Sequence, residues 1–401
     1  MIFTLIRNEY RKLVRKPKTW VIFGLFTILV AGMCYVSKLQ SDDMAFYSSA
    51  EGQIEQLKQS IKSEQESLND AKKNKDSESI KMCEDNIKDY KNQIKRLQVI
   101  IDNKDNPDYW KESLKEEKKN LKETMNDKTI SEEEKISAEQ RIDEINEYLD
   151  KDIKPIESWE FNAVNFAINF MEMLGQVILA CGIAVFMSDI VSGECTPPTL
   201  KFLLVQPISR GKVLLSKFIA VTTTVIGLIG GLEILAFLII GIFTGFDAAK
   251  MPTLVGSKYI MKYANDGSAT LSLVAGSGHY VSRGVFLLES FAFQMLFILA
   301  CCAFVFLISS LFKSSMVTMA VSVISVVVIS MITAMSSKVA SIAHYIFLTY
   351  ASPNWVISGD GCNMYNNPNI TLGMGIVVLI VTTIICYVIA HIVFKKKDIL
   401  I

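Results

Sequence analysis

Apolar residues gather into six long stretches that carry almost no charge. A helix that crosses a bilayer core of about 30 Å needs about 20 predominantly apolar residues, and each stretch reaches or comes close to this length. We therefore expect an all-α, polytopic membrane protein of six helices. The predicted spans are residues 20–37, 164–187, 218–245, 285–312, 313–335 and 372–394.

A long polar segment, residues 38–163, separates the first two predicted spans. Its strongest apolar pattern alternates three and four residues apart, which is the seam of a coiled coil. A weaker seam between Ile54 and Ala71 has a different phase, so we expect a stutter or a break near residues 75–79. The stronger seam consists of Ile80, Cys83, Ile87, Tyr90, Ile94, Leu97 and Ile101.

The same segment contains signals for a reversal of the chain. Asn, Asp and Pro residues at 103–107 favour a turn, and Ser131 with Glu134 forms a capping box on the return arm. We therefore expect an extracellular coiled-coil helical hairpin. A continuous helical arm of about 50 residues would project on the order of 75 Å.

Lys and Arg near the span ends orient the chain, because positive residues in short loops resist translocation and acidic residues contribute little. These residues concentrate in 1–19, 188–217 and 395–401, so we expect those segments and both termini in the cytoplasm. The hairpin, a loop at 246–284 and an outer or re-entrant segment at 336–371 then lie outside. The predicted location is the cell (plasma) membrane.

The first residues combine apolar and basic positions at helical spacing. Residues 1–19 predict an amphipathic helix on the inner membrane surface, and an ordinary basic flank of the first span is the alternative. A basic start followed by an apolar run is also typical of a signal peptide. The run ends in Cys34, Tyr35 and Val36 instead of a small-x-small cleavage site, so we favour a retained span.

The net charge of zero hides two opposite parts. Residues 38–163 contain 22 Lys and Arg against 31 Asp and Glu, a net of −9, and the other residues contain 19 against 10, a net of +9. The acidic hairpin could bind basic peptides. The solvated surface of a helical hairpin explains the same charges.

The most specific pattern lies in residues 188–217. Asp189 and Glu194 follow the second predicted span, an apolar patch comes next, and Pro207 breaks the chain before a basic run. This order resembles the cytoplasmic coupling segment of permease subunits of type-2 ATP-binding-cassette transporters of the bacterial exporter type. The matching positions are Glu194, Thr199, Leu203, Leu204, Pro207, Ser209, Arg210 and Lys217, and Asp189 joins them as a candidate for ATPase coupling.

Two further observations bear on this resemblance. Asn8–Leu13 also looks like the first helix of that family, whereas Pro198 stands where the family usually has glycine. Proline fixes φ and removes a backbone donor, so the local backbone can differ at that point. The resemblance covers nearly all of the chain except the hairpin.

The resemblance implies that a separate cytoplasmic ATP-binding-cassette ATPase drives the transport. ATP and Mg²⁺ would bind to that partner, and this chain would carry no cofactor and no enzymatic activity. In agreement, it has no G-x-x-x-x-G-K-[ST] phosphate loop, because Gly211–Lys212 is followed by valine and has no glycine five residues earlier. A second permease copy or a paralogue would complete a dimer in the membrane lipid. The sequence shows neither metal-ligand spacing nor a nucleic-acid motif.

A few polar side chains fall inside the predicted spans. Glu233 lies near the middle of the third span, where an ionisable residue costs several kcal/mol unless it faces a partner or water. Handling of substrate or protons is one interpretation, and a protonated or hydrogen-bonded glutamate at a helix interface is the other. The remaining pathway or helix-interface candidates are Glu172, Glu289 and Gln294, which could line a cleft, and Gly227 and Gly231, whose spacing favours close helix packing. For the two glutamates, hydration at the interface is the alternative.

The favoured function is an ATP-driven export permease that moves a peptide, lipid-like or drug-like substrate outward. The hairpin shifts this prediction toward peptides, either antimicrobial or other. One alternative is a mechanotransmitting subunit whose hairpin relays ATPase motion while nothing crosses the bilayer. A passive membrane sensor or scaffold is another, and it predicts that no ATPase copurifies with the chain.

Overall fold

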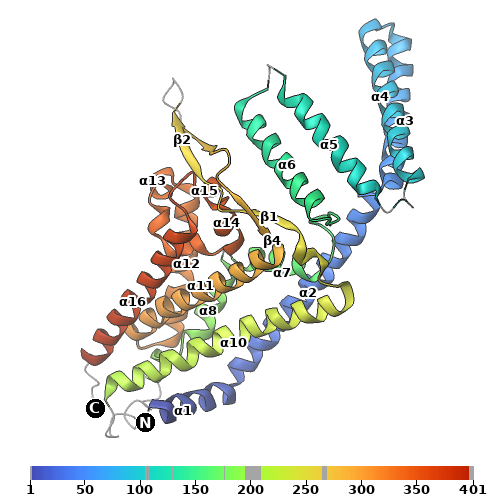
Figure 1. Ribbon diagram of the computed structural model, residues 1–401. Helices are drawn as coiled ribbons and strands as arrows, with labels where there is room; N and C mark the ends of the chain where they lie inside the picture. The colour runs from blue at the N-terminus through green and yellow to red at the C-terminus, as the bar shows by residue number, and fades with distance from the viewer. Residues whose placement is uncertain are drawn as a thin grey trace. The chain divides into compact units, whose positions relative to one another are not determined.

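The computed structural model describes residues 2–103, 106, 108–127, 130–175, 177–194, 209–263 and 269–396, and most of them are helical (Figure 1). The chain forms two compact units. The first consists of Met1–Cys34, Ser131–Gln140 and Asn162–Ile401, and the second of Tyr35–Ile130 and Arg141–Phe161. Because most of the described residues are helical, the prediction of a mainly helical chain is confirmed for them.

In the part of the chain that the structure describes, five helices are long and apolar enough to cross a membrane. α2 belongs to the first unit up to Cys34 and continues without a break into the second. The helices overlap five of the six predicted spans. They are α2 (Pro17–Ser48), α10 (Arg210–Thr244), α11 (Arg283–Leu311), α12 (Ser315–Met335) and α16 (Leu372–Lys396).

The second predicted span is not a single straight helix. It consists of α7 (Ala163–Gly175) and α8 (Ile178–Met187), which meet at an angle of 66°. A Cβ atom added at Gly175 would lie 2.4 Å from the carbonyl oxygen of Ala351, in the connection between α12 and α16. The backbone at Ala351 approaches the end of α7 so closely that position 175 requires glycine. Counted as one broken span, the pair brings the number of spans among the described residues to six.

α11 is the central helix of the first unit. Of its most apolar 18 residues, 61% are buried, against 11–22% in the other four candidate spans. Small residues from Ala300 to Ala303 and at Ser309 and Ser310 are buried on it, and such residues allow neighbouring helices to approach closely. α11 contacts α16, α8 and α10 along much of its length.

The prediction of an all-α protein is wrong between α10 and α11. This segment forms two antiparallel pairs of short strands after the 3₁₀ helix η2 (Asp247–Lys250). β1 (Pro252–Val255) pairs with β4 (His279–Ser282), and β2 (Tyr259–Tyr263) pairs with β3 (Ala269–Leu273). Strands of four or five residues give too little alternation to stand out in a sequence.

A group of short helices connects α12 to α16. β1 is anchored on this group, because Gly256 and Ser257 donate backbone hydrogen bonds to the carbonyls of Ile357 and Ser358, both at 2.9 Å. The short helices are α13 (Ser337–Ala340), η3 (Ala343–Tyr345), η4 (Phe347–Tyr350), α14 (Pro353–Ser358) and α15 (Gly361–Tyr365). In the first unit, the strands and the ends of α1 and α16 lie at opposite ends (Figure 1). We refer to these as the strand end and the α1 end.

The second unit differs from the single hairpin that we predicted. α3 (Ala50–Asn74) and α4 (Ser77–Asp102) run antiparallel, since Asn86 donates to Glu64 at 2.9 Å and Lys72 pairs with Glu84. The chain reverses at Lys75, which is left-handed with φ 53°. The predicted change near residues 75–79 is therefore confirmed, and it is a turn between two helices, so no arm of about 50 residues is continuous here.

The remaining helices of this region form another antiparallel pair. α5 (Tyr109–Met125) and α6 (Glu132–Asp150) are joined by an ion pair from Arg141 to Glu117 at 2.7 Å. The capping box is confirmed, because the backbone N–H of Ser131 donates to Glu134 and the N–H of Glu134 donates to the Ser131 hydroxyl.

Candidate functional site

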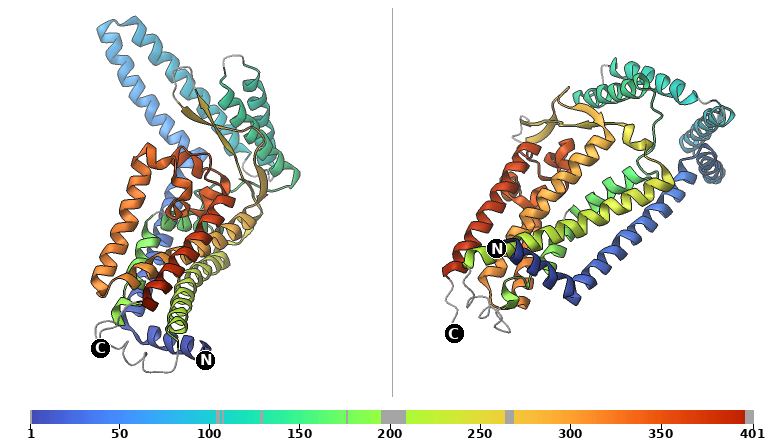
Figure 2. Two further views of the ribbon diagram at one scale, coloured as in Figure 1. Left: turned by 90° about the vertical axis from the view of Figure 1, so that its left-hand side faces the viewer. Right: turned by 60° about the horizontal axis from the view of Figure 1, so that its bottom comes forward.

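The first functional element is the amphipathic helix α1 (Ile2–Arg15). Pro17 opens α2, and the chain turns sharply between the two helices (Figure 2). The turn is held by side chains of α2, since the Thr19 hydroxyl donates to the Leu13 carbonyl at 2.7 Å and the Trp20 indole N–H to the Val14 carbonyl at 2.8 Å. These bonds satisfy carbonyls that the end of a helix leaves unpaired, so the direction of α1 is fixed.

α1 is attached to the beginning of α10 by a buried ion pair. Glu9 Oε2 lies 3.0 Å from Lys217 Nζ, and the two side chains are only 14% and 2% exposed. The other Glu9 oxygen accepts from Lys12 at 2.9 Å, and the neighbouring Tyr10 shares a hydrogen bond with Thr223 of α10. Breaking such a buried pair by removing one partner costs about 3–5 kcal/mol, so this attachment is strong.

A second group of charges attaches α2 to the end of α8. Asp189 accepts from Lys16 at 3.0 Å and from Lys18 at 2.9 Å, and Lys18 also donates to the Ser188 hydroxyl at 3.2 Å. Burial by itself would raise the pKa of the Asp189 carboxyl, but the positive charges of Lys16 and Lys18 lower it below its ordinary value. Asp189 is therefore an anion at neutral pH.

The Glu9 carboxyl has the same electrostatic character. Burial tends to raise its pKa, and Lys217 and Lys12 together lower it below the ordinary value. Both acids thus remain charged and keep their lysine partners. We call the five residues Glu9, Lys16, Lys18, Asp189 and Lys217 the ion-pair cluster.

Ser309 of α11 fixes the segment that follows α8. Its hydroxyl accepts from the backbone N–H groups of Val191 and Ser192, each at 3.2 Å, and donates to the carbonyl of Ser188 at 3.2 Å. All of these groups are buried, and the Ser192 hydroxyl adds a bond to the Ser188 carbonyl at 2.7 Å. The chain is therefore held firmly up to η1 (Ser192–Glu194).

A cavity of about 520 Å³ lies at the α1 end between these attachments. Its lining includes Glu9, Lys16, Asp189 and Lys217, so both ion pairs face the same space. The cluster joins α1, α2, α8 and α10 at one place. Such an arrangement can pass a displacement of one helix to the other three.

The structure describes four of the eight predicted coupling residues. Asp189 and Lys217 belong to the ion-pair cluster, Arg210 is the first residue of α10, and Glu194 ends η1. The other four coupling residues lie outside the described residues: Thr199, Leu203, Leu204 and Pro207.

Sequence reasoning did not place Glu9, Lys16 or Lys18 in the site. A signal was present, because Glu9 is the first acidic residue of the chain and the next is Asp42, while basic residues surround it. An isolated acid in a basic segment is a candidate for a specific partner. The partner itself, 208 positions away, could not be read from the sequence.

Within the predicted spans, the structure brings together Glu233 of α10 and Gln294 of α11. The Gln294 amide donates to Glu233 Oε1 at 2.9 Å, and both side chains are buried. Glu289 is exposed and Glu172 half-buried, so neither joins this pair. An added Cβ at Gly227 or Gly231 would meet no atom of the described chain within 4 Å, whereas at Gly230 it would lie 3.1 Å from Phe291. The close approach of α10 to α11 is therefore at Gly230.

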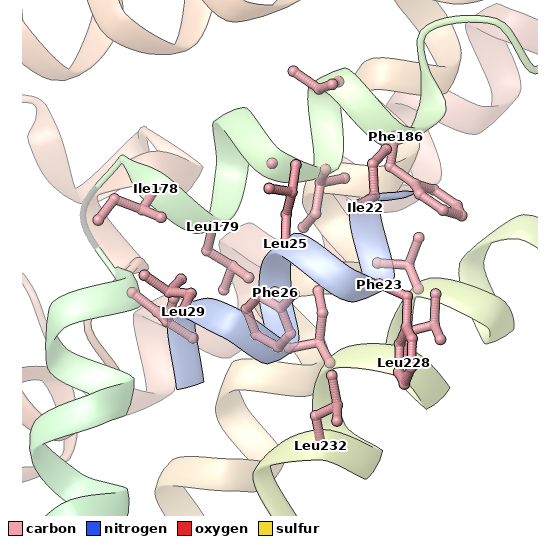
Figure 3. A pocket seen from close by; sticks show the side chains of 16 residues that line it. Ile22, Phe23, Leu25, Phe26, Leu29, Ile178, Leu179, Phe186, Leu228 and Leu232 are labelled. Carbon is pink, nitrogen blue, oxygen red and sulfur yellow. The ribbon is translucent and has the colours of Figure 1, made fainter. Parts of the chain in front are cut away.

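A separate apolar cavity of about 390 Å³ lies between α2, α8 and α10 (Figure 3). Leu25 and Leu29 face it from α2, Ile178 and Leu179 from α8, and Leu228 from α10. Its lining consists entirely of apolar residues and Gly182. The cavity suits hydrocarbon and offers a charged group no partner.

The comparisons with known proteins agree with this architecture. A family model described as "ABC-2 family transporter protein" matches residues 3–399. The chain is also similar to the uncharacterized protein YhcI of Bacillus subtilis (strain 168), with 23% identity over 400 residues that cover 99% of each protein. The matched range includes the four-helix region between α2 and α7.

Proposed function

The chain belongs to the ABC-2 family of transporter proteins, and from this premise we propose that it is the permease subunit of an exporter. The family implies an ATP-binding-cassette ATPase as partner. In our proposal ATP and Mg²⁺ bind to that ATPase, and two permease chains, identical or related, form the pathway in the lipid. The α1 end faces the cytoplasm and the strand end faces outward, in line with the distribution of Lys and Arg.

The observation that carries the proposal is the ion-pair cluster. Asp189 of the cluster precedes the segment 195–208 in the chain and Lys217 follows it, and the resemblance to a coupling segment is strongest in this segment. The end before this segment is held by Lys16, Lys18 and Ser309, and the helix after it is held by Glu9 through Lys217. A push on the segment would therefore move α8, α10 and α1 together.

The partner is tested first, by purifying the chain from native membranes in mild detergent and identifying the proteins that accompany it. We expect an ATP-binding-cassette ATPase. If no ATPase accompanies the chain under conditions that retain other membrane complexes, the exporter proposal falls and the sensor or scaffold becomes the better reading.

The coupling role is tested in the reconstituted complex, with ATP hydrolysis and transport measured in parallel. Glu194→Ala and Arg210→Ala should retain ATP hydrolysis and lose transport, because the segment between them would no longer pass on the motion. Lys313→Ala, a basic residue between α11 and α12, is the control. Full transport in both coupling variants would refute the assignment.

One observation favours a second function. α2 is a continuous helix from Pro17 to Ser48, so the first candidate span extends directly into the second unit. A continuous helix can transmit a mechanical displacement. ATP-dependent changes of distance within the second unit, in vesicles that move no substrate, would support mechanotransmission over export.

A further inference from the structure

A third cavity, of about 450 Å³, lies between α7, α10 and α11. Glu233 is its sole ionisable lining residue among those described. Glu233 is 11 residues from the strand end of α10, and Gln294 is 11 residues from the strand end of α11. At a rise of 1.5 Å per residue, both lie about 16 Å from that end, near the middle of a hydrocarbon core of about 30 Å.

The polar atoms around Glu233 are short of hydrogen-bond donors. The Gln294 amide satisfies Glu233 Oε1, but within the described chain no donor reaches Glu233 Oε2, Gln294 Oε1 or the Ser290 hydroxyl. Glu233 is 9% exposed, and Ser290 and Gln294, one turn apart on α11, are fully buried. An unsatisfied buried acceptor destabilises the folded chain, so a ligand that donates hydrogen bonds here would offset that cost.

The remaining lining of the cavity is apolar and rich in aromatic rings. Phe166 and Phe170 come from α7, Phe237 from α10 and Phe291 from α11. Aromatic faces attract cations, and an ionised carboxylate at this depth needs a counter-charge. A cavity of a few hundred Å³ with an apolar wall and a few polar groups also has the size of a small-molecule site.

We infer that this cavity binds a primary alkylammonium amphiphile, with the ammonium group donating to Glu233 Oε2 and the hydrocarbon chain lying among the phenylalanines. This amphiphile is the substrate class of the exporter, so that part of the inference rests on the proposed function. The binding itself does not require the ATPase.

The test uses the full chain in phosphatidylcholine nanodiscs and a dodecylammonium probe that carries a photoreactive diazirine in its chain. We expect labelling of α10 near 233–238 and of α11 near 287–291. Dodecylammonium should displace the probe at least tenfold better than dodecanol, because the alcohol cannot supply the counter-charge. Equal displacement by the two compounds in the wild-type chain overturns the inference.

Variants locate the site independently. Glu233→Gln keeps the shape of the side chain and should weaken probe binding about tenfold or more. Ala167→Trp should fill the cavity and abolish labelling, whereas Leu228→Trp, in the cavity of Figure 3, should leave it unchanged. Unchanged labelling in folded Glu233→Gln, or loss in Leu228→Trp alone, places the ligand elsewhere and refutes the inference.

The outcome is separable from that of the proposed function. If the probe does not bind but an ATPase copurifies and coupling depends on Glu194 and Arg210, the exporter stands and this substrate class falls. If the probe binds and no ATPase accompanies the chain, the site stands and the exporter falls.

Discussion

The ion pair between Glu9 and Lys217 allows the sharpest test of the coupling site. The perturbation is Glu9→Gln, which removes the charge and keeps the shape. Lys217 is 2% exposed, so it would keep a buried positive charge opposite a neutral amide. Loss of one partner of a buried pair costs about 3–5 kcal/mol. Because Glu9 also lines the cavity at the α1 end, which water can enter, we expect the lower end of this range, about 3 kcal/mol.

A neighbouring pair provides the matched control. Lys12 binds the same carboxylate, but its side chain is 47% exposed, and an exposed pair contributes about 0–1 kcal/mol. Lys12→Ala should therefore change stability far less than Glu9→Gln. In the double variant Glu9→Gln with Lys217→Met, the buried charge is gone, and part of the loss should return.

The assay is thermal unfolding in nanodiscs, followed by intrinsic fluorescence. It compares the wild type, Glu9→Gln, Lys217→Met, the double variant of these two and the control Lys12→Ala. We expect a coupling energy between Glu9 and Lys217 of about 1–3 kcal/mol. Additive effects of the two substitutions, or equal effects of Glu9→Gln and Lys12→Ala, would refute the view that this pair holds α1 on α10.

The same pair predicts a dependence on pH. In the folded chain the pKa of Glu9 lies below its ordinary value, so its stabilisation is fully present above the ordinary glutamate pKa of about 4.3. It is lost as the pH falls through the lowered folded-state pKa. The difference in stability between the wild type and Glu9→Gln should stay constant from about pH 8 to 6 and shrink below about pH 4. A difference that disappears between pH 8 and 6 would contradict this assignment.

Two further predictions address other parts of the chain. Ser309→Val should lower the free energy of unfolding by about 1–3 kcal/mol, because two buried N–H groups lose their acceptor. The control Ser310→Ala should cost less, since the Ser310 hydroxyl donates to the Leu307 carbonyl of its own helix. Equal shifts of the thermal midpoint would contradict the role of Ser309. Spin labels at Glu55→Cys and Arg96→Cys, with the native cysteines replaced, should lie within about 20 Å of each other if α3 and α4 are antiparallel. A continuous helix would separate the labels by about 60 Å. A distance near the larger value, measured by pulsed electron paramagnetic resonance, would rule out the reversal at Lys75.

Long apolar runs made the membrane helices predictable from the sequence, and the pattern of residues 188–217 made the family predictable. The features that the sequence did not reveal depend on contacts between distant residues. The bend between α7 and α8 accompanies the close approach of Ala351 to Gly175 and a hydrogen bond from Asn354 to the Ile168 carbonyl at 2.8 Å. No local pattern around Gly175 encodes those neighbours.

The second unit shows a different limit. A shift in the phase of the apolar seam near Lys75 is compatible with a stutter in one long helix and with a turn between two helices. The structure has the turn, because Lys75 adopts a left-handed conformation and Asp76 caps α4 by accepting from the N–H groups of Glu78 and Ser79. The choice thus depends on the packing of Cys83 and its apolar neighbours between α3 and α4, which heptad spacing alone does not specify.

α10 has 35 residues, which corresponds to about 52 Å of helix against a hydrocarbon core of about 30 Å. It therefore contains both Lys217, which belongs to the ion-pair cluster, and Glu233, which lines the cavity between α7, α10 and α11. The two residues are 16 positions apart. A rigid tilt of about 10° pivoting at Lys217 would swing Glu233 through about 4 Å, more than the length of a hydrogen bond. If the cavity binds an ammonium group as inferred above, a tilt of this size is enough to break and re-form its hydrogen bond to Glu233.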